Sequence, residues 1–204
     1  MIQRQIKAVV GGISEARPGF AALPKVAEEI EDITETVPAV SLLNQEFTRD
    51  NFAHQVQTLA PNVVHLATHG QFGSSQAETF LLTWDGRLNV RELAELLQNR
   101  DVSHDNPLEL LVLSACDTAA GDERAVLGIA GFAVRSGARS TVATLWPVRD
   151  NVAAEVMAQF YKTFRQPGIT KVEALRRAQR SLLAEERFNA PFFWASFIVV
   201  GNWL

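Results

Sequence analysis

Residues 108–116 have the sequence LELLVLSAC. The stretch Leu108–Ala115 is almost continuously apolar, which is typical of a strand covered on both faces in a parallel sheet. Parallel strands are joined by helices, and the rest of the chain alternates short apolar runs with amphipathic stretches. The sequence therefore predicts a three-layer α/β fold, with a mostly parallel sheet of about six strands between helices.

The other elements are predicted from periodicity and from turn and capping residues. Asp85-Gly86, between two apolar runs, predicts a hairpin. Thr48 or Asp50 and, further on, Thr170 are the expected helix caps. No repeat or linker divides the chain, so residues 1–204 are expected to form one domain. The predicted strands are Ile6–Ile13, Val37–Leu43, Val63–Thr68, Leu108–Ala115, Thr141–Trp146 and Phe197–Val200, and the predicted helices are Leu23–Thr36, Asn51–Leu59, Val90–Gln98, Leu127–Ser136, Asn151–Phe164 and Val172–Glu186.

Composition narrows the class of protein. The net charge of −4 and the pI of about 5.6 argue against nucleic acid as a partner, because phosphate binding needs a basic face. No stretch approaches the roughly 18 apolar residues that a membrane span needs. The single cysteine, Cys116, excludes an intramolecular disulfide and suits a reducing cytoplasm. It also excludes zinc sites built on several thiolates, and we expect no metal and no cofactor.

Two reactive side chains follow predicted strands. His69 comes directly after Val63–Thr68, and Cys116 directly after Leu108–Ala115. Ligands of open α/β sheets collect at the carboxyl ends of the strands, so these two residues would lie side by side if their strands are neighbours. An imidazole beside a thiol lowers the thiol pKa and favours the thiolate, which is the nucleophile. The backbone N–H of Gly70 could approach a developing oxyanion closely.

Each of these residues also has a structural interpretation. A lone cysteine at the end of an apolar strand is often a small core residue. A histidine after a strand often belongs to a loop or a cap. The separation of 116 − 69 = 47 residues is near the roughly 50 found in caspases, where the histidine also comes first. Spacing and strand-end position together leave both interpretations open.

Four longer motifs resemble the CHAT family of caspase-like domains, which belongs to the same clan as separase and the caspases. They occur in the family's order and extend the resemblance over nearly the whole chain. They are HLATHGQF (His65–Phe72), LVLSACDTAAGD (Leu111–Asp122), GIAGFAVRSGARSTVATLWPVRD (Gly128–Asp150) and PFFWASFIVVGNWL (Pro191–Leu204).

The resemblance implies a cysteine endopeptidase that acts on protein substrates. It implies that His69 is the general base, that Cys116 is the nucleophile, and that backbone N–H groups of Gly70 and Cys116 form the oxyanion hole. Some members of the family depend on a partner, on a conformational switch or on cleavage of their own chain, and many are attached to tetratricopeptide repeats. A repeat domain or another effector is therefore an expected partner.

The segment LWPVRD is similar to a segment of separase whose last aspartate holds the basic residue preceding the scissile bond. Asp150 occupies that position, so the resemblance implies a preference for Arg or Lys. Asp150 could equally cap the helix predicted from Asn151, and Arg149 could pair with it. Asp117 and Trp146 are further candidate substrate-binding residues, although a turn role for Asp117 and plain packing for Trp146 are alternatives.

Two other functions remain as alternatives. A caspase-like module without turnover would serve as a regulatory or scaffold domain that binds a partner protein. A nucleotide-binding domain is disfavoured, because Gly11-Gly12 after the first strand is not followed by the Lys-Ser/Thr of a phosphate loop. His65, inside an apolar strand, is predicted to be a core histidine with satisfied hydrogen bonds.

Overall fold

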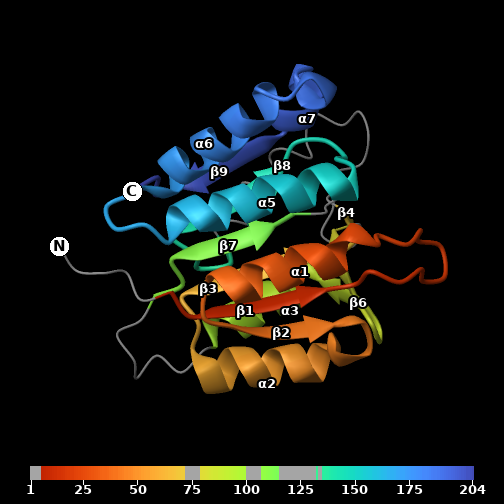
Figure 1. Cartoon of the computed structure of the whole chain (residues 1–204). Coiled ribbons are helices and arrows are strands. Elements are labelled where there is room, and N and C mark those ends of the chain that lie inside the picture. The colour runs from red at the N-terminus through yellow and green to blue at the C-terminus, as the bar shows by residue number, and fades with distance from the viewer. Residues whose placement is uncertain (1–5, 72–78, 100–106, 115–131, 133–134) are drawn as a thin grey trace.

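A computed structural model describes residues 6–71, 79–99, 107–114, 132 and 135–204. Its main sheet has six strands in the order β2-β1-β3-β7-β8-β9 (Figure 1). Neighbouring strands are parallel except β8 and β9, which are antiparallel. The predicted fold class is thereby confirmed. The strands are β1 (Ala8–Gly12), β2 (Ala39–Leu43), β3 (Val63–Ala67), β7 (Leu110–Leu113), β8 (Ser140–Thr144) and β9 (Phe197–Gly201).

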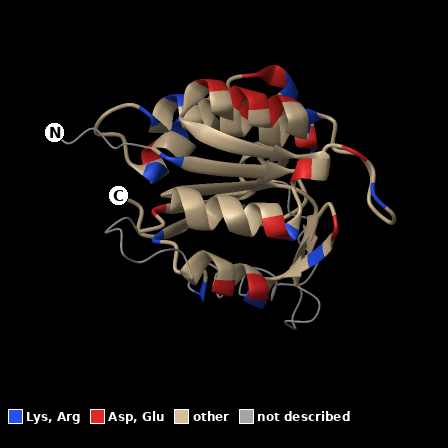
Figure 2. Cartoon of the chain, turned by 90° about the horizontal axis from the view of Figure 1, so that it is seen from below, with Lys and Arg blue, Asp and Glu red and all other residues tan. Residues whose placement is uncertain are grey.

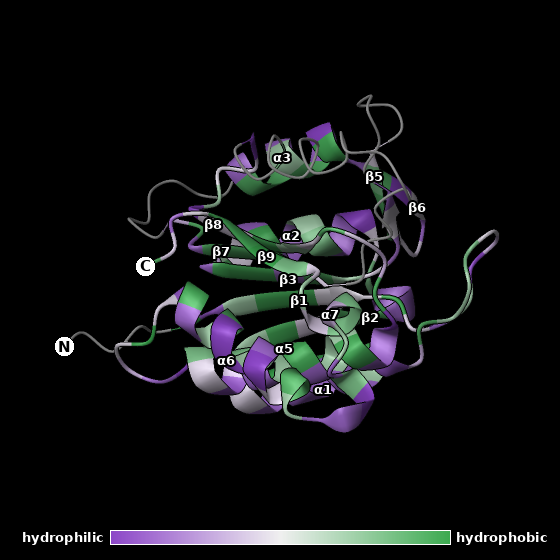
Figure 3. Ribbon diagram, turned by 90° about the horizontal axis from the view of Figure 1, so that it is seen from above, coloured by the Kyte–Doolittle hydropathy of each residue, from purple (hydrophilic) through white to green (hydrophobic). Residues whose placement is uncertain are grey.

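Helices cover both faces of this sheet, which gives three layers (Figure 3). One face carries α1 (Lys25–Thr36), α5 (Asp150–Phe164) and α6 (Lys171–Leu183), and the other carries α2 (Arg49–Leu59) and α3 (Val90–Gln98). Successive residues of a strand point to opposite faces. Each central strand therefore contributes side chains to both cores, which explains why β7 is apolar throughout and why β1 and β3 are largely apolar. Shorter helical elements are η1 (Asn44–Glu46), η3 (Glu186–Phe188) and α7 (Pro191–Trp194).

The helix starts follow the capping residues in the sequence. The Thr48 side chain accepts a hydrogen bond from Asn51 N–H, and the Thr170 side chain accepts one from Glu173 N–H, as predicted. Helix α6 ends at Leu183, three residues before the predicted end. The predicted helix Leu127–Ser136 lies mostly outside the described residues.

A small second sheet follows β3. It consists of β4 (Gly70–Gln71), β5 (Phe80–Thr83) and β6 (Gly86–Asn89), all antiparallel. The predicted hairpin is present, but its turn is Trp84-Asp85, one residue earlier than the predicted Asp85-Gly86. Gly86 instead begins β6 with a φ of 150°, a value that other residues rarely adopt.

Gly11 and Gly12 have a packing role at the end of β1. A Cβ on Gly11 would lie 2.3 Å from the Phe47 ring, and one on Gly12 would lie 2.7 Å from both the Ala67 carbonyl oxygen and a Val26 methyl group. These distances are far below a normal contact, so only glycine allows α1 and the end of β3 to approach β1 this closely.

The surface is acidic along α1, whose sequence is KVAEEIEDITET, whereas Lys and Arg are spread over several elements (Figure 2). Within the described ranges, no helix has the length and apolar character required to cross a membrane.

Candidate catalytic site

His69 lies between the two sheets, after the carboxyl end of β3 and before β4. The backbone of Leu82 in β5 fixes this connection twice. Thr68 Oγ1 donates to Leu82 O at 2.8 Å, and Leu82 N–H donates to His69 O at 2.8 Å. The backbone on both sides of the His69 ring is therefore held rigidly.

The His69 ring is oriented by a backbone carbonyl from the β1–α1 loop. Its Nε2 lies 2.8 Å from Ala21 O. A carbonyl oxygen can only accept, so Nε2 carries a proton and donates it, and the neutral ring offers Nδ1 as its acceptor nitrogen. The Phe20 ring packs on the His69 ring with the centroids 5.2 Å apart, and Phe20 in turn contacts Phe80 edge-on. A base held by a third group is the arrangement of nucleophile-activating sites.

Gly70 is buried, and its N–H lies on the outer edge of the small sheet. In the β4–β5 ladder Gly70 pairs with Leu81, and the hydrogen bond from Leu82 N–H to His69 O makes this a non-hydrogen-bonded pair. The N–H of Gly70 therefore points away from β5. Because β4 is the edge strand of the small sheet, this N–H is not used by that sheet.

Cys116 and Asp117 lie outside the described residues, but the strand that leads to Cys116 is described. Strand β7 is the immediate neighbour of β3, with Val63 opposite Leu110 and Leu66 opposite Leu113, an offset of 110 − 63 = 47 residues. Ser114 N–H donates to Leu66 O at 3.1 Å, so the pairing continues past the last ladder residues. The same 47 residues separate His69 from Cys116.

Asp150 is the first residue of α5 and joins the starts of two helices. Its Oδ1 accepts from Asn151 N–H at 2.9 Å, and its Oδ2 accepts from the N–H of Lys25, the first residue of α1, at 3.0 Å. Within the described part of the chain, Arg149 forms no ion pair with Asp150. The carboxylate thus sits at the carboxyl-end rim of the sheet, in a bridging role that the sequence did not reveal.

Trp146 follows β8 at the same rim. Its ring stacks on Phe192 of α7 with the centroids 6.3 Å apart, and its Nε1–H donates to Phe192 O at 2.9 Å. In the sheet order, β7 separates β8 from β3, so Trp146 and His69 follow strands that are not adjacent. Along this rim, Trp146 is therefore separated from His69 by the end of β7.

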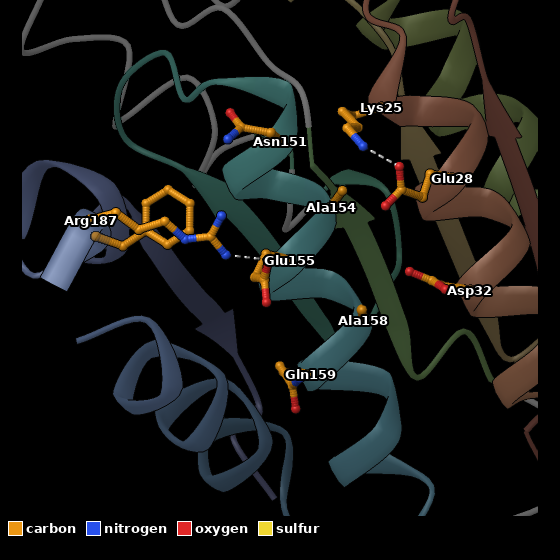
Figure 4. A pocket seen from close by; sticks show the side chains of 10 residues that line it. Lys25, Glu28, Asp32, Asn151, Ala154, Glu155, Ala158, Gln159 and Arg187 are labelled. Atoms are coloured by element: carbon orange, nitrogen blue, oxygen red, sulfur yellow. Dashed lines mark hydrogen bonds and ion pairs between the residues drawn. The ribbon is translucent and has the colours of Figure 1, made fainter. Parts of the chain in front are cut away.

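A pocket of about 470 Å³ opens between α1, α5 and η3 (Figure 4). Two ion pairs, Lys25–Glu28 and Arg187–Glu155, occupy its walls. Asp32 points into it from α1, and burial, followed by the charge of Glu28, raises the pKa of its carboxyl group. This pocket does not include His69. It is lined by Lys25, Glu28, Asp32, Asn151, Ala154, Glu155, Ala158, Gln159, Arg187 and Phe188.

His65 is a fully buried core histidine, as predicted. Its Nε2 lies 2.9 Å from Glu29 Oε1, and its Nδ1 lies 3.2 Å from the hydroxyl of Tyr161. This network ties β3 to α1 and α5 and lies inside the strand, before the rim that carries His69.

Sequence reasoning missed the groups that orient His69. Ala21 acts through its carbonyl oxygen and Leu82 through its backbone, and every residue has these groups, so no side-chain pattern marks them. The one available signal was Pro18-Gly19 in the same loop, which predicts a tight turn but not what the turn approaches.

Comparison with known proteins agrees with this architecture. The sequence matches the CHAT domain family over residues 2–202. No match was found among curated proteins. The Arg-specific cysteine proteinase gingipain R of Porphyromonas gingivalis superposes with a TM-score of 0.61 at 10% identity, covering 98% of this chain and 47% of that one. This chain therefore spans about half the length of the gingipain chain that it matches.

Two further solved structures are similar. The Drosophila initiator caspase Dronc has a TM-score of 0.54 at 7% identity, with 98% of this chain and 82% of that chain covered. A protein from Geobacter sulfurreducens has a TM-score of 0.54 at 13% identity, with 96% and 93% covered. With the family match over nearly all of its length, the chain belongs to the CHAT domain family and has the caspase-like fold.

Proposed function

We propose that this chain is a cysteine peptidase in which Cys116 is the nucleophile and His69 is its base. The observation that carries the proposal is the common offset of 47 residues between β3 and β7 and between His69 and Cys116. Neighbouring strands lie roughly 4.8 Å apart, so equal offsets favour two side chains at the same level of the rim. A nucleophile and its base need this proximity.

In the proposed reaction Nδ1 of His69 takes the proton of the Cys116 thiol, and the resulting thiolate attacks the scissile carbonyl carbon. The negative charge moves to the carbonyl oxygen, where the N–H groups of Gly70 and Cys116 would donate to it. His69 then protonates the leaving amine, and the acyl group stays on the sulfur. In the second half, His69 takes a proton from water, which attacks the thioester and releases the acid and the free thiol. Ala21 O keeps the imidazole oriented throughout.

The proposed substrate is a protein or peptide with Arg or Lys before the scissile bond. Each oxygen of the Asp150 carboxylate accepts one backbone N–H, and a carboxylate oxygen has two lone pairs. Asp150 therefore keeps acceptor capacity for a guanidinium or ammonium group while it bridges α1 and α5. Asp117 and Trp146 are proposed as further substrate-binding groups at the same rim of the sheet.

We further propose that the peptidase works in the cytoplasm and is switched on by a repeat-domain or effector partner, or by cleavage of its own chain. The alternative is a module without turnover that only binds such a partner. Exposed aromatic side chains near the C-terminus favour this alternative as a docking surface, since Phe192 is 55% and Trp203 56% exposed.

Labelling of Cys116 by a peptidyl electrophile separates the two functions. The chain has one cysteine, so any thiol adduct identifies its site without mapping. A peptidase should be labelled rapidly, and His69→Ala should slow labelling by about a hundredfold or more, the scale of a lost general base. His54→Ala, which removes an exposed histidine of α2, is the matched control. An inert Cys116 in a chain that binds a repeat domain tightly would establish the scaffold function instead.

A further inference from the structure

The loop that carries Ala21, residues 13–24, contacts the β5–β6 hairpin through the side chains of Arg17 and Phe20. The Arg17 guanidinium carbon lies 3.8 Å from the centroid of the Trp84 ring, and Arg17 Nη2 donates to Trp84 O at 2.8 Å. Stacking fixes the plane of the guanidinium group, and the hydrogen bond fixes its direction. The two contacts together therefore determine where the tip of the loop lies.

A tight turn connects Arg17 to the two residues that contact the His69 ring, Phe20 and Ala21. Arg17 and Phe20 exchange both backbone hydrogen bonds, at 3.0 and 2.8 Å, across Pro18-Gly19, and Gly19 has a φ of 84°. Proline followed by a glycine with positive φ is the composition of a rigid type II turn. Phe20 then packs on the His69 ring, and the next residue supplies the carbonyl that accepts from Nε2.

The rest of the loop gives this tip little support. Its base is held by Asn44, whose Oδ1 accepts from Ser14 N–H at 2.8 Å and from Glu15 N–H at 3.3 Å. Between that base and α1 most residues are exposed, and Ala21 itself is exposed. The described side-chain anchors of the tip are Arg17 on Trp84 and Phe20 on both His69 and Phe80. Without the Arg17 anchor, the carbonyl would be held, within the described residues, only by the ring contacts of Phe20 and by the hydrogen bond from Leu23 N–H to Ser14 O that closes the loop.

We infer that Arg17 is a positioning residue for His69. Held on Trp84, it keeps Ala21 O in line with His69 Nε2, so that the ring keeps its proton there and turns Nδ1 toward the nucleophile. This inference rests on the proposed peptidase function for its catalytic consequence. The coupling of Arg17 to the His69 ring is a structural claim that does not depend on that function.

Peptide cleavage by Arg17→Ala, Arg17→Lys and Trp84→Leu tests the catalytic consequence. Arg17→Ala should lower kcat about tenfold and leave KM within about twofold, because a shifted base affects the chemical step more than binding. Arg17→Lys and Trp84→Leu should lie between wild type and Arg17→Ala, since each keeps one of the two contacts. The matched control is Arg91→Ala, which removes an exposed arginine paired with Glu95 on α3 and should match wild type.

The same substitutions in a Cys116→Ala background test the coupling without any turnover. The ring ¹⁵N shifts of His69, assigned by comparison with His69→Ala, should show loss of the Nε2–H form in Arg17→Ala and no change in Arg91→Ala. Unchanged His69 shifts in Arg17→Ala would overturn the inference. A chain that neither cleaves nor labels would contradict the peptidase proposal alone, because the ring shifts still report on Arg17. If Arg17→Ala fails to fold, Arg17→Lys and Trp84→Leu give the same two readouts.

Discussion

His69 Nε2 donates to the carbonyl oxygen of Ala21, 2.8 Å away, across 48 residues of sequence. The contact assigns the two ring nitrogens different roles, because a carbonyl cannot donate. It also joins the loop after β1 to the end of β3, two neighbouring strands of the sheet. The carbonyl thus holds the imidazole in one tautomer, as the buried aspartate does in Ser-His-Asp triads.

The first prediction concerns that tautomer. In the Cys116→Ala chain, neutral His69 should be protonated on Nε2, and its Nε2 proton should exchange slowly with water because Ala21 O binds it. Ring ¹⁵N shifts of labelled histidine measure this directly, and His54, exposed on α2, serves as the internal reference. A His69 ring protonated on Nδ1 would contradict the contact and the role of Ala21 in it.

The second prediction separates the two roles of Asp150. Asp150→Asn keeps an oxygen that can accept from Lys25 N–H, so stability should change by less than about 1 kcal/mol. Asp150→Ala removes both acceptors at the helix starts and should cost about 1–2 kcal/mol in the free energy of unfolding. Both changes remove the charge, so cleavage after Arg or Lys should fall about a hundredfold in each.

Urea denaturation and a peptide-library cleavage profile measure these effects. Asp50→Asn, a charge removal in the first turn of α2, is the control and should affect neither the profile nor the stability strongly. If Asp150→Ala is destabilised but its residue preference is unchanged, Asp150 is a structural bridge and the basic preference comes from elsewhere.

The sequence predicted the sheet well because buried parallel strands have largely continuous apolar sequences. β3 and β7 were predicted this way, and with β3 the position of His69 shortly after a strand end. β4 was missed because two residues are too few to show a period. The hairpin turn was misplaced by one residue because Gly86 suits both a turn and a strand start with positive φ.

Side-chain type was a poorer guide to the site than to the sheet. The role of Ala21 depends on where a backbone carbonyl lies, and the bridge from Asp150 to Lys25 N–H spans 125 residues. Both are tertiary contacts in which one partner is a backbone group, so a local sequence pattern cannot predict them. The network around His65 was partly foreseen, since a polar residue inside an apolar strand must find partners.

The third prediction concerns that network. His65→Leu leaves Glu29 buried without its hydrogen-bond partner, and Glu29 Oε2 already has none among the described residues. The free energy of unfolding should fall by about 3 kcal/mol, the cost of an uncompensated buried polar or charged group. Replacing both residues by leucine should recover at least half of that loss. Urea denaturation of the two variants decides the point, and a double variant less stable than His65→Leu would show that Glu29 has another partner.

The fourth prediction is an alkaline limit to stability set by Tyr161. Burial, followed by the nearby charge of Glu29, raises the pKa of its phenol well above 10 in the folded chain. Because the folded chain keeps the phenol protonated, the contribution of Tyr161 to stability is complete below pH 10. It is lost as the pH rises further, because only the unfolded chain then ionises. Above pH 10, wild type should lose about 1.4 kcal/mol per pH unit relative to Tyr161→Phe.

Tyrosinate absorbance measures this without interference, because Tyr161 is the only tyrosine in the chain. In denaturant the absorbance should rise with a midpoint near the ordinary value of about 10. In the native chain it should appear only together with loss of the circular dichroism signal. A tyrosinate signal at pH 10 in a chain that remains folded would mean that the phenol is accessible, and that the contact with His65 Nδ1 does not close this part of the core.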